Sequence, residues 1–187
     1  MSDAQLNPEK LFLSPGEVLP QWIDLNGHMN VAYYLLAFDQ ADEHGLQRYL
    51  GYSPQFLADT QMSTMSAEAR VRYRREILEG EAFCIFSQLL DFDEKRWHEV
   101  QYMVRGSAED WAGLSDPSDI PASELVATHE WLALSVDLSV RRVRPFHAET
   151  LAGLQRIWEL HQHFAIPEFV GGFMGVTPAK SLAKRQA

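Results

Sequence analysis

The stretch WIDLNGHMNVAY, residues 22–33, places an acid, an amide, a turn glycine and an imidazole within five positions. It stands directly ahead of a long segment in which apolar residues recur at helical spacing. An Asn-Gly pair alone would turn the chain, and Asn30 alone would cap the helix that follows. Asp24 and His28 therefore exceed what a turn requires, and the stretch becomes the first candidate for a functional site.

Residues 31–50 predict a single helix about 30 Å long. Asn30 occupies its N-cap, Met29 and Tyr34 take the positions of a hydrophobic staple, and Gly51 falls just past its end. The apolar positions that carry this periodicity are Tyr34, Leu35, Phe38, Ala41, Leu46 and Tyr49.

After a Ser/Pro/Gln connection the pattern changes to alternation, which predicts strands. Residues 107–123 contain two prolines and no periodicity, which predicts a long loop, and residues 148–164 return to helical spacing. One short strand, one long helix and four long strands in succession indicate an α+β fold with an antiparallel sheet. The four strands are expected at residues 66–78, 81–93, 96–106 and 124–138, and the short first strand within residues 11–23.

The composition sets the class of protein. A chain of 187 residues that is 46% hydrophobic predicts one domain over residues 1–187. A formal charge of −10 argues against nucleic acid as a partner. The single cysteine, Cys84, is typical of a reducing compartment, and neither an apolar run of ~20 residues nor an export signal is visible. We therefore expect a cytoplasmic protein that does not bind membranes.

Three segments together resemble the hotdog fold, specifically its 4-hydroxybenzoyl-CoA thioesterase-like branch. They are DLNGHMNVAYY, RVRYRREILEGE and ATHEWLALSVDLSVRRVRPF. The resemblance implies a long central helix packed on an antiparallel sheet of about five strands, with a core at about residues 18–146 and a C-terminal helical extension at residues 147–187. Together with the tail segment IPEFVGGFMGV, these motifs are also similar to thioesterases of carnitine breakdown, which act on betainyl-CoA.

The resemblance implies hydrolysis of an acyl-CoA thioester to a free acid and CoA. It assigns Asp24 as general base or nucleophile, and Asn26 and His28 as orienting or polarising groups. A helix that begins at Asn30 leaves its first amides unpaired and positive, so the amides near Asn30 and Val31 are candidates to hold the thioester oxygen. Without the resemblance, Asp24 and His28 would be read as loop residues.

Glu68, Asp39 and Glu43 are the other candidate carboxylates for the site. Glu68 either faces the site from its strand, as a substrate-binding residue, or is simply exposed. Asp39 and Glu43 lie four residues apart on one face of the predicted helix, more than two turns from its positive end, which favours a structural or dimer-contact role.

Arginines are candidates for the phosphates of CoA, since guanidinium groups bind phosphate in bidentate fashion. We assign this role to Arg70, Arg72 and Arg142; a solvated sheet face is the alternative. Among the aromatic residues, any that escape the core could enclose a quaternary ammonium through cation–π contacts. The arginine-rich segments also contain Arg74, Arg75, Arg141 and Arg144, and the aromatic candidates are Trp97, Tyr102, Trp131 and Phe146.

The exposed edge of a hotdog sheet predicts a homodimer or homotetramer. A hydratase or dehydratase on the same fold would need an acid–base pair aimed at the acyl α and β carbons, and no such signature is visible. A non-catalytic acyl-CoA-binding module is a second alternative. We expect no cofactor, because CoA is part of the substrate, and no metal site, because His161 and His163 face apart on a helix.

Overall fold

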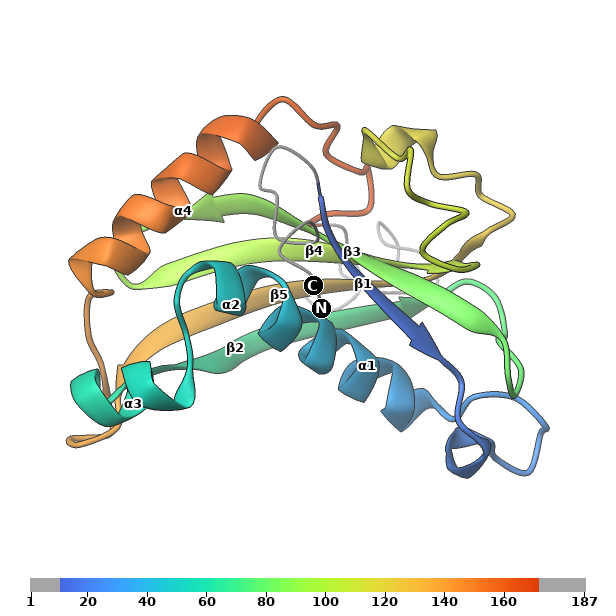
Figure 1. Cartoon of the computed structure of the whole chain (residues 1–187), viewed down its shortest axis with the longest axis horizontal. Coiled ribbons are helices and arrows are strands. Elements are labelled where there is room, and N and C mark those ends of the chain that lie inside the picture. Colours follow the sequence, from blue (N-terminus) through green and yellow to red (C-terminus); the bar gives the residue numbers. More distant parts are fainter. Residues whose placement is uncertain (1–10, 172–187) are drawn as a thin grey trace, which may run out of the picture.

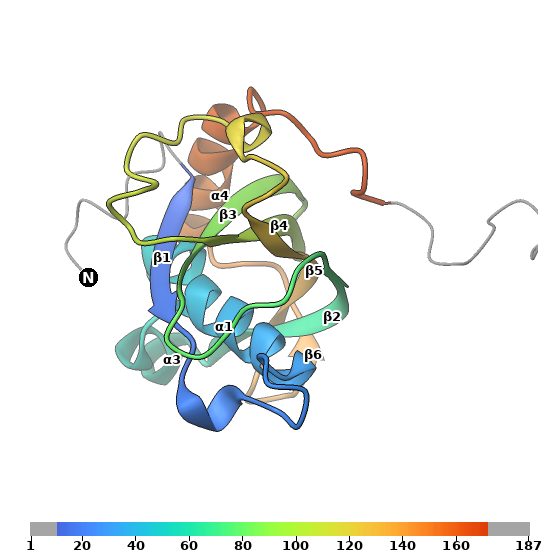
Figure 2. The ribbon, with the colours of Figure 1, turned by 90° about the vertical axis from the view of Figure 1, so that its right-hand side faces the viewer.

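The computed structural model describes residues 11–171. A six-stranded antiparallel sheet, ordered β1-β3-β4-β5-β2 with β6 paired to β5, curls around the helix α1 (Figures 1 and 2). This α+β arrangement confirms the fold expected from the sequence. The elements are β1 (Phe12–Glu17), η2 (Pro20–Trp22), α1 (Val31–His44), α2 (Leu46–Tyr49), α3 (Pro54–Thr60), β2 (Met62–Tyr73), β3 (Ala82–Phe92), β4 (Arg96–Arg105), η3 (Pro117–Asp119), β5 (Leu125–Asp137), β6 (Arg142–Val143) and α4 (Ala148–His161).

Helix α1 begins where its sequence predicts. The side chain of Asn30 accepts a hydrogen bond from the amide of Ala32 at 3.0 Å, which satisfies one of the free amides of the first turn. Met29 and Tyr34 are buried in the same hydrophobic cluster, as a staple requires.

The prediction of one helix over residues 31–50 is wrong at Gly45. The backbone there leaves the helical region, α1 ends at His44, and α2 is a separate short helix. A Cβ at position 45 would lie 3.0 Å from the carbonyl oxygen of Ala41 and 3.2 Å from Cβ of Phe12. The glycine therefore permits a close approach to β1 at the position where the helix breaks.

The connection to β2 also differs from expectation. Residues 54–60 form the helix α3, capped by Ser53, whose hydroxyl accepts a hydrogen bond from the amide of Phe56 at 3.1 Å. Strand β2 runs from Met62 to Tyr73 rather than over residues 66–78, because it pairs with β5 along that whole length. Its second edge has no partner strand among the described residues.

The remaining strands lie within two residues of their predicted bounds. In the turn between β3 and β4, Oδ1 of Asp93 accepts hydrogen bonds from the amides of Lys95 and Arg96, both at 2.8 Å. The segment 107–123 is a loop that contains only η3. Helix α4, the predicted C-terminal helix, packs Leu154 and Ile157 against the aromatic cluster around Trp97. In the described part of the chain, no helix combines the length and apolar character needed to cross a membrane.

Candidate active site

The turn before α1 is closed by its own backbone. Ile23 and Met29 form an isolated β-bridge, and the amide of Asp24 donates to the carbonyl of His28 at 3.0 Å. Gly27 adopts φ 82°, a conformation that suits glycine, and its amide donates to the carbonyl of Asp24 at 3.0 Å. The quoted motif therefore folds into one tight loop.

This loop is fixed to the core of the protein. The amide of Met29 donates to the carbonyl of Ile77 at 3.0 Å, and Met29 is fully buried. The amide of Asn30 donates to the carbonyl of Trp22 at 2.8 Å. These bonds hold the loop at the N-terminus of α1 and keep the polar side chains of the loop at a constant position relative to the helix.

The carboxylate of Asp24 is held in a defined orientation. Its Oδ1 accepts the amide of Asn26 at 2.7 Å and lies 3.9 Å from Nδ1 of His28. Oδ2 is not hydrogen-bonded to any described residue, and the side chain is 20% exposed. One oxygen therefore anchors the carboxylate, and the other is accessible to a water molecule or to a substrate.

Of the two amides expected to hold an oxyanion, only one is free. The Asn30 amide is already bonded to the carbonyl of Trp22. Val31 is the first residue of α1, so its amide has no acceptor within the helix. The first turn of α1 thus offers the Val31 amide together with the positive end of the helix dipole.

Asp24 and His28 line different hollows. Asp24 borders a hollow of about 540 Å³ together with Asn30, Ala32 and Tyr33. The imidazole of His28, 31% exposed, borders a separate hollow of about 270 Å³, and its Nδ1 lies 3.2 Å from the carbonyl oxygen of Met29. Both hollows border the first turn of α1: Asn30 and Ala32 line the one with Asp24, and Val31 lines the one with His28. The Asn26 side chain is exposed.

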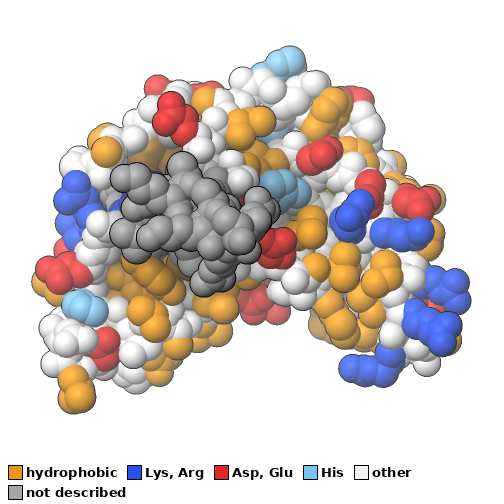
Figure 3. All heavy atoms as spheres, turned by 180° about the vertical axis from the view of Figure 1, so that it is seen from behind, with side chains coloured by type: hydrophobic (Ala, Val, Ile, Leu, Met, Phe, Trp, Pro, Cys, Tyr) orange, Lys and Arg blue, Asp and Glu red, His pale blue; other side chains and the backbone are white. Residues whose placement is uncertain are grey.

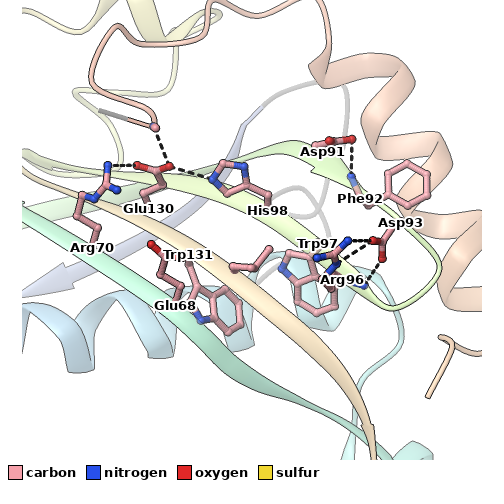
Figure 4. A pocket seen from close by; sticks show the side chains of 12 residues that line it. Glu68, Arg70, Asp91, Phe92, Asp93, Arg96, Trp97, His98, Glu130 and Trp131 are labelled. Atoms are coloured by element: carbon pink, nitrogen blue, oxygen red, sulfur yellow. Dashed lines mark hydrogen bonds and ion pairs between the residues drawn. The ribbon is translucent and has the colours of Figure 1, made fainter. Parts of the chain in front are cut away.

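Glu68 and Arg70 lie elsewhere, in a hollow of about 380 Å³ on the other side of the sheet. There NH1 of Arg70 is 3.2 Å from Oε2 of Glu130, and Nε2 of His98 is 3.1 Å from Oε1 of the same carboxylate. Figure 4 shows these three side chains on one side of the strands and the ring of Trp131 on the other. Glu68 thus does not approach Asp24 within the chain.

The other arginines are also spread out. The guanidinium groups of Arg72 and Arg74 lie over the ring of Phe169, at 5.5 and 5.8 Å from its centroid. Arg142 lies in β6 and is exposed, and it makes no ion pair with a described residue. Within one chain, Arg142 and Asp24 are at opposite ends of the β2–β5 pair, because Arg142 pairs with Asp137 and Asp137 pairs with Met62.

Most of the aromatic candidates belong to the core. Trp97 is fully buried and stacks on Phe146 with ring centroids 5.5 Å apart, and Tyr102 is buried in a different cluster. These rings are enclosed by other side chains. Trp131 is itself only 6% exposed, but it lines a hollow of about 380 Å³ between α1 and the strands β2 and β5. Trp97 and Trp131 both border the hollow that contains Glu68 and Arg70.

The sequence did not reveal three polar residues buried between α1 and the sheet. Asp42 and Glu99 form a carboxyl pair, and burial raises the pKa of both, that of Asp42 to about 7. Burial lowers the pKa of His129 to about 4, so this imidazole is neutral at pH 7. Glu99 and His129 lie on strands with alternating patterns, but alternation does not tell which face is covered by a helix.

Within residues 11–171, no cluster of three or more His, Cys, Asp or Glu side chains is placed to hold a metal ion. His161 is buried in α4, where its Nδ1 accepts the amide of Leu89 at 3.0 Å. His163 lies beyond the end of α4.

Known proteins resemble this chain in sequence and in fold. The family model of the thioesterase-like superfamily matches residues 18–154. Betainyl-CoA thioesterase of Pseudomonas aeruginosa is 30% identical over 164 residues, which cover 87% of this chain and 93% of that protein.

Two solved structures from Staphylococcus aureus share the fold. A protein solved in complex with CoA matches with a TM-score of 0.74 at 20% identity, over 94% of this chain and 100% of that one. A DHNA-CoA thioesterase matches with a TM-score of 0.67 at 13% identity, over 83% of this chain and 95% of that one. The hotdog fold expected from the sequence is confirmed.

Proposed function

The chain belongs to the thioesterase-like superfamily, and we propose that it hydrolyses a short, positively charged acyl-CoA such as betainyl-CoA, with Asp24 as the catalytic carboxylate. Its activity as an acyl-CoA thioesterase follows from the family and from the P. aeruginosa relative. The similarity to that relative also supports betainyl as the acyl group. One structural observation carries the residue assignment: the carboxylate of Asp24 and the N-terminus of α1 border the same hollow.

The geometry supports the following reaction. A water molecule attacks the thioester carbonyl carbon while Oδ2 of Asp24 takes its proton. The carbonyl oxygen becomes an oxyanion, which the Val31 amide and the positive helix end stabilise. The carbon–sulfur bond then breaks, and the proton on Asp24 passes to the departing thiolate of CoA. If Asp24 attacks the carbon itself, an acid anhydride forms and water hydrolyses it in a second step.

Two neighbours of Asp24 have supporting roles in this proposal. Asn26 acts through its backbone amide, which holds Oδ1 and leaves Oδ2 for chemistry. His28 acts as an orienting group on the flank of the helix N-terminus, with its Nδ1–H directed to the carbonyl of Met29. Glu68 and Arg70 lie in a hollow of their own, so a role for them in substrate binding would require a second subunit.

We propose that the enzyme is at least a homodimer formed along β2. The free edge of this strand presents unpaired backbone groups, and exposed apolar side chains surround it. Figure 3 shows hydrophobic side chains gathered along the lower margin of the face seen from behind. The exposed apolar residues of the loop, α1 and β2 are Leu25, Val31, Leu35, Leu36, Met65 and Tyr73.

Such a dimer would also complete the CoA site. When two copies of β2 pair in antiparallel fashion, the Met62 end of one strand lies beside the Tyr73 end of the other. Arg142 is connected to the Met62 end through β5. Tyr73 lines the same hollow as His28 and Val31. The arginines of one subunit would therefore approach the helix N-terminus of the other.

A thiol-release assay tests the function. The purified full chain is given acetyl-, isobutyryl-, benzoyl-, palmitoyl- and betainyl-CoA, and free CoA is measured with a thiol reagent. We expect release with several substrates and the highest kcat/KM with betainyl-CoA. Absence of release with all five, together with a saturable rise in Tm on adding acyl-CoA, would indicate a binding module instead of an enzyme.

A further inference from the structure

A second hollow of about 380 Å³ lies between α1 and the strands β2 and β5. One of its sides is the outer face of α1, and the other is formed by residues of the two strands that point toward the helix. Its lining consists of Ala32, Leu35, Leu36, Asp39, Ser66, Ala69, His129 and Trp131.

This hollow begins at the first turn of α1. Its helical residues 32, 35, 36 and 39 share one face, because they are spaced by three and four positions. Ala32 also lines the hollow that contains Asp24. A group bonded to a carbonyl carbon at the helix N-terminus would therefore extend past Ala32 toward Asp39 and Trp131.

The lining presents acceptors and an aromatic ring, and it contains no lysine or arginine. Asp39 supplies a carboxylate. The indole N–H of Trp131 donates to the hydroxyl of Ser66 at 2.7 Å, which fixes the ring and uses its only donor. Asp39 is exposed at the rim and Trp131 lies within the same hollow. A lining with a carboxylate and an indole attracts a cation and offers nothing to an anion.

His129 adds a lone pair to this lining. The side-chain amide of Gln101 donates to the carbonyl of Phe38 at 3.0 Å, which leaves its Oε1 to accept from Nδ1 of His129 at 2.8 Å. Nε2 then bears the lone pair, and it has no hydrogen-bond partner among the described residues. The side chain is only 4% exposed, and burial lowers its pKa to about 4, so the ring stays neutral and does not repel a cation at pH 7.

We propose that this hollow holds the quaternary ammonium end of the acyl group, and that Trp131 and Asp39 determine the specificity for it. The inference rests on the proposed function, since it places the acyl group of the thioester that Asp24 cleaves. The methyl groups of the ammonium contact the indole, and the carboxylate of Asp39 balances the charge.

The dimensions agree with a short acyl group. Asp39 lies eight positions after Val31, so their Cα atoms are about 12 Å apart along the helix axis. The side chain of Asp39 tilts back toward the N-terminus, which shortens that distance. An ammonium two bonds from the carbonyl carbon fits between the two positions.

The test compares two substrates of the same shape, betainyl-CoA and the neutral 3,3-dimethylbutyryl-CoA. For Asp39→Asn we expect kcat/KM to fall roughly tenfold for betainyl-CoA and less than about threefold for the neutral substrate. Trp131→Leu should likewise lower the ratio of kcat/KM for betainyl-CoA to kcat/KM for the neutral substrate. Glu43→Gln, which removes an acid one turn further along α1 and outside the hollow, is the matched control and should leave the ratio unchanged. Tm values of all variants report on folding, and a folding defect lowers both rates together.

Each other outcome has a defined meaning. If Asp39→Asn lowers both rates equally, Asp39 serves catalysis or folding and the inference is wrong. Equal cleavage of both substrates by the unaltered enzyme also overturns it, while the thioesterase function survives. If the unaltered enzyme releases CoA from neither, nor from the other acyl-CoAs above, the proposed function fails and the inference fails with it.

Discussion

Asp42 in α1 and Glu99 in β4 form a carboxyl pair between the helix and the sheet, and the two residues are 2% and 0% exposed. Burial raises the pKa of both groups, and repulsion by Asp42 raises that of Glu99 further, so the protonated form of the pair is favoured. Gln47 donates a hydrogen bond to Oδ2 of Asp42. The pair connects the helix to the sheet. It holds a proton that the same carboxyl groups lose in the unfolded chain once the pH exceeds their ordinary pKa.

The first prediction concerns stability and pH. Burial raises the pKa of Asp42 from 3.8 to about 7, so between these values the folded state binds a proton that the unfolded state lacks. Stability from this group is present at pH 4 and is lost as the pH rises to 7, by at most about 1.4 kcal/mol per pH unit. His129 has the opposite effect on stability below pH 6.5. Because its folded pKa is lowered, the stability that it contributes increases as the pH rises toward 6.5.

The difference in unfolding free energy between the unaltered protein and Asp42→Asn isolates the contribution of Asp42, since Glu99 stays buried in both. The asparagine cannot ionise, so the variant should gain stability relative to the unaltered protein as the pH rises from 4 to 7. Urea unfolding at several pH values measures this. A difference in unfolding free energy that is constant across the range would show that Asp42 holds no extra proton in the folded state.

The second prediction concerns catalysis. Asp24→Asn keeps an oxygen that can accept the Asn26 amide, so the loop should fold, but the base or nucleophile is lost. We expect kcat to fall by roughly 10²–10⁴. Asp116→Asn is the control, because Oδ1 of Asp116 accepts the amide of Ser118 at 2.8 Å in a similar turn within the 107–123 loop. Retention of more than about a third of the activity in Asp24→Asn would refute the assignment.

The third prediction concerns CoA binding. Arg142→Ala should raise KM for acyl-CoA about fivefold with little change in kcat, since phosphate contacts far from the carbonyl contribute equally to ground state and transition state. High salt should reduce the effect. Arg96, which is paired with Asp93, provides the control Arg96→Ala. An unchanged KM at low ionic strength would leave Arg142 as a solvated surface residue.

The fourth prediction concerns assembly. Met65 on the free strand β2 is 40% exposed, and Met65→Lys places a charge where a second β2 would pair. We expect the mass measured by light scattering to shift toward the monomer and the activity to fall at least tenfold, because each site would lose the arginines of its partner. Ile166→Lys, at another exposed apolar residue, should change neither quantity. A fully active monomer would contradict the proposed dimer.

Local features of the sequence were sufficient for much of the fold. Three kinds of feature depend only on residues close together in the chain: the cap at Asn30, the turn at Asp93, and the alternation in β3, β4 and β5. Each could therefore be predicted without knowing which distant segments pack against it. The D-x-N-G-H motif likewise located the loop at the helix N-terminus, and the family resemblance of this motif made Asp24 a candidate for catalysis.

Contacts between distant residues decided the rest. The break at Gly45 occurs where the helix approaches Phe12, the length of β2 depends on its pairing with β5, and the burial of His129 and Glu99 depends on which face of the sheet α1 covers. The separation of Asp24 from His28 into two hollows depends on how the loop docks on Ile77 and Trp22. A sequence pattern records the preferences of neighbouring residues, whereas these features arise only when segments far apart in the chain pack together.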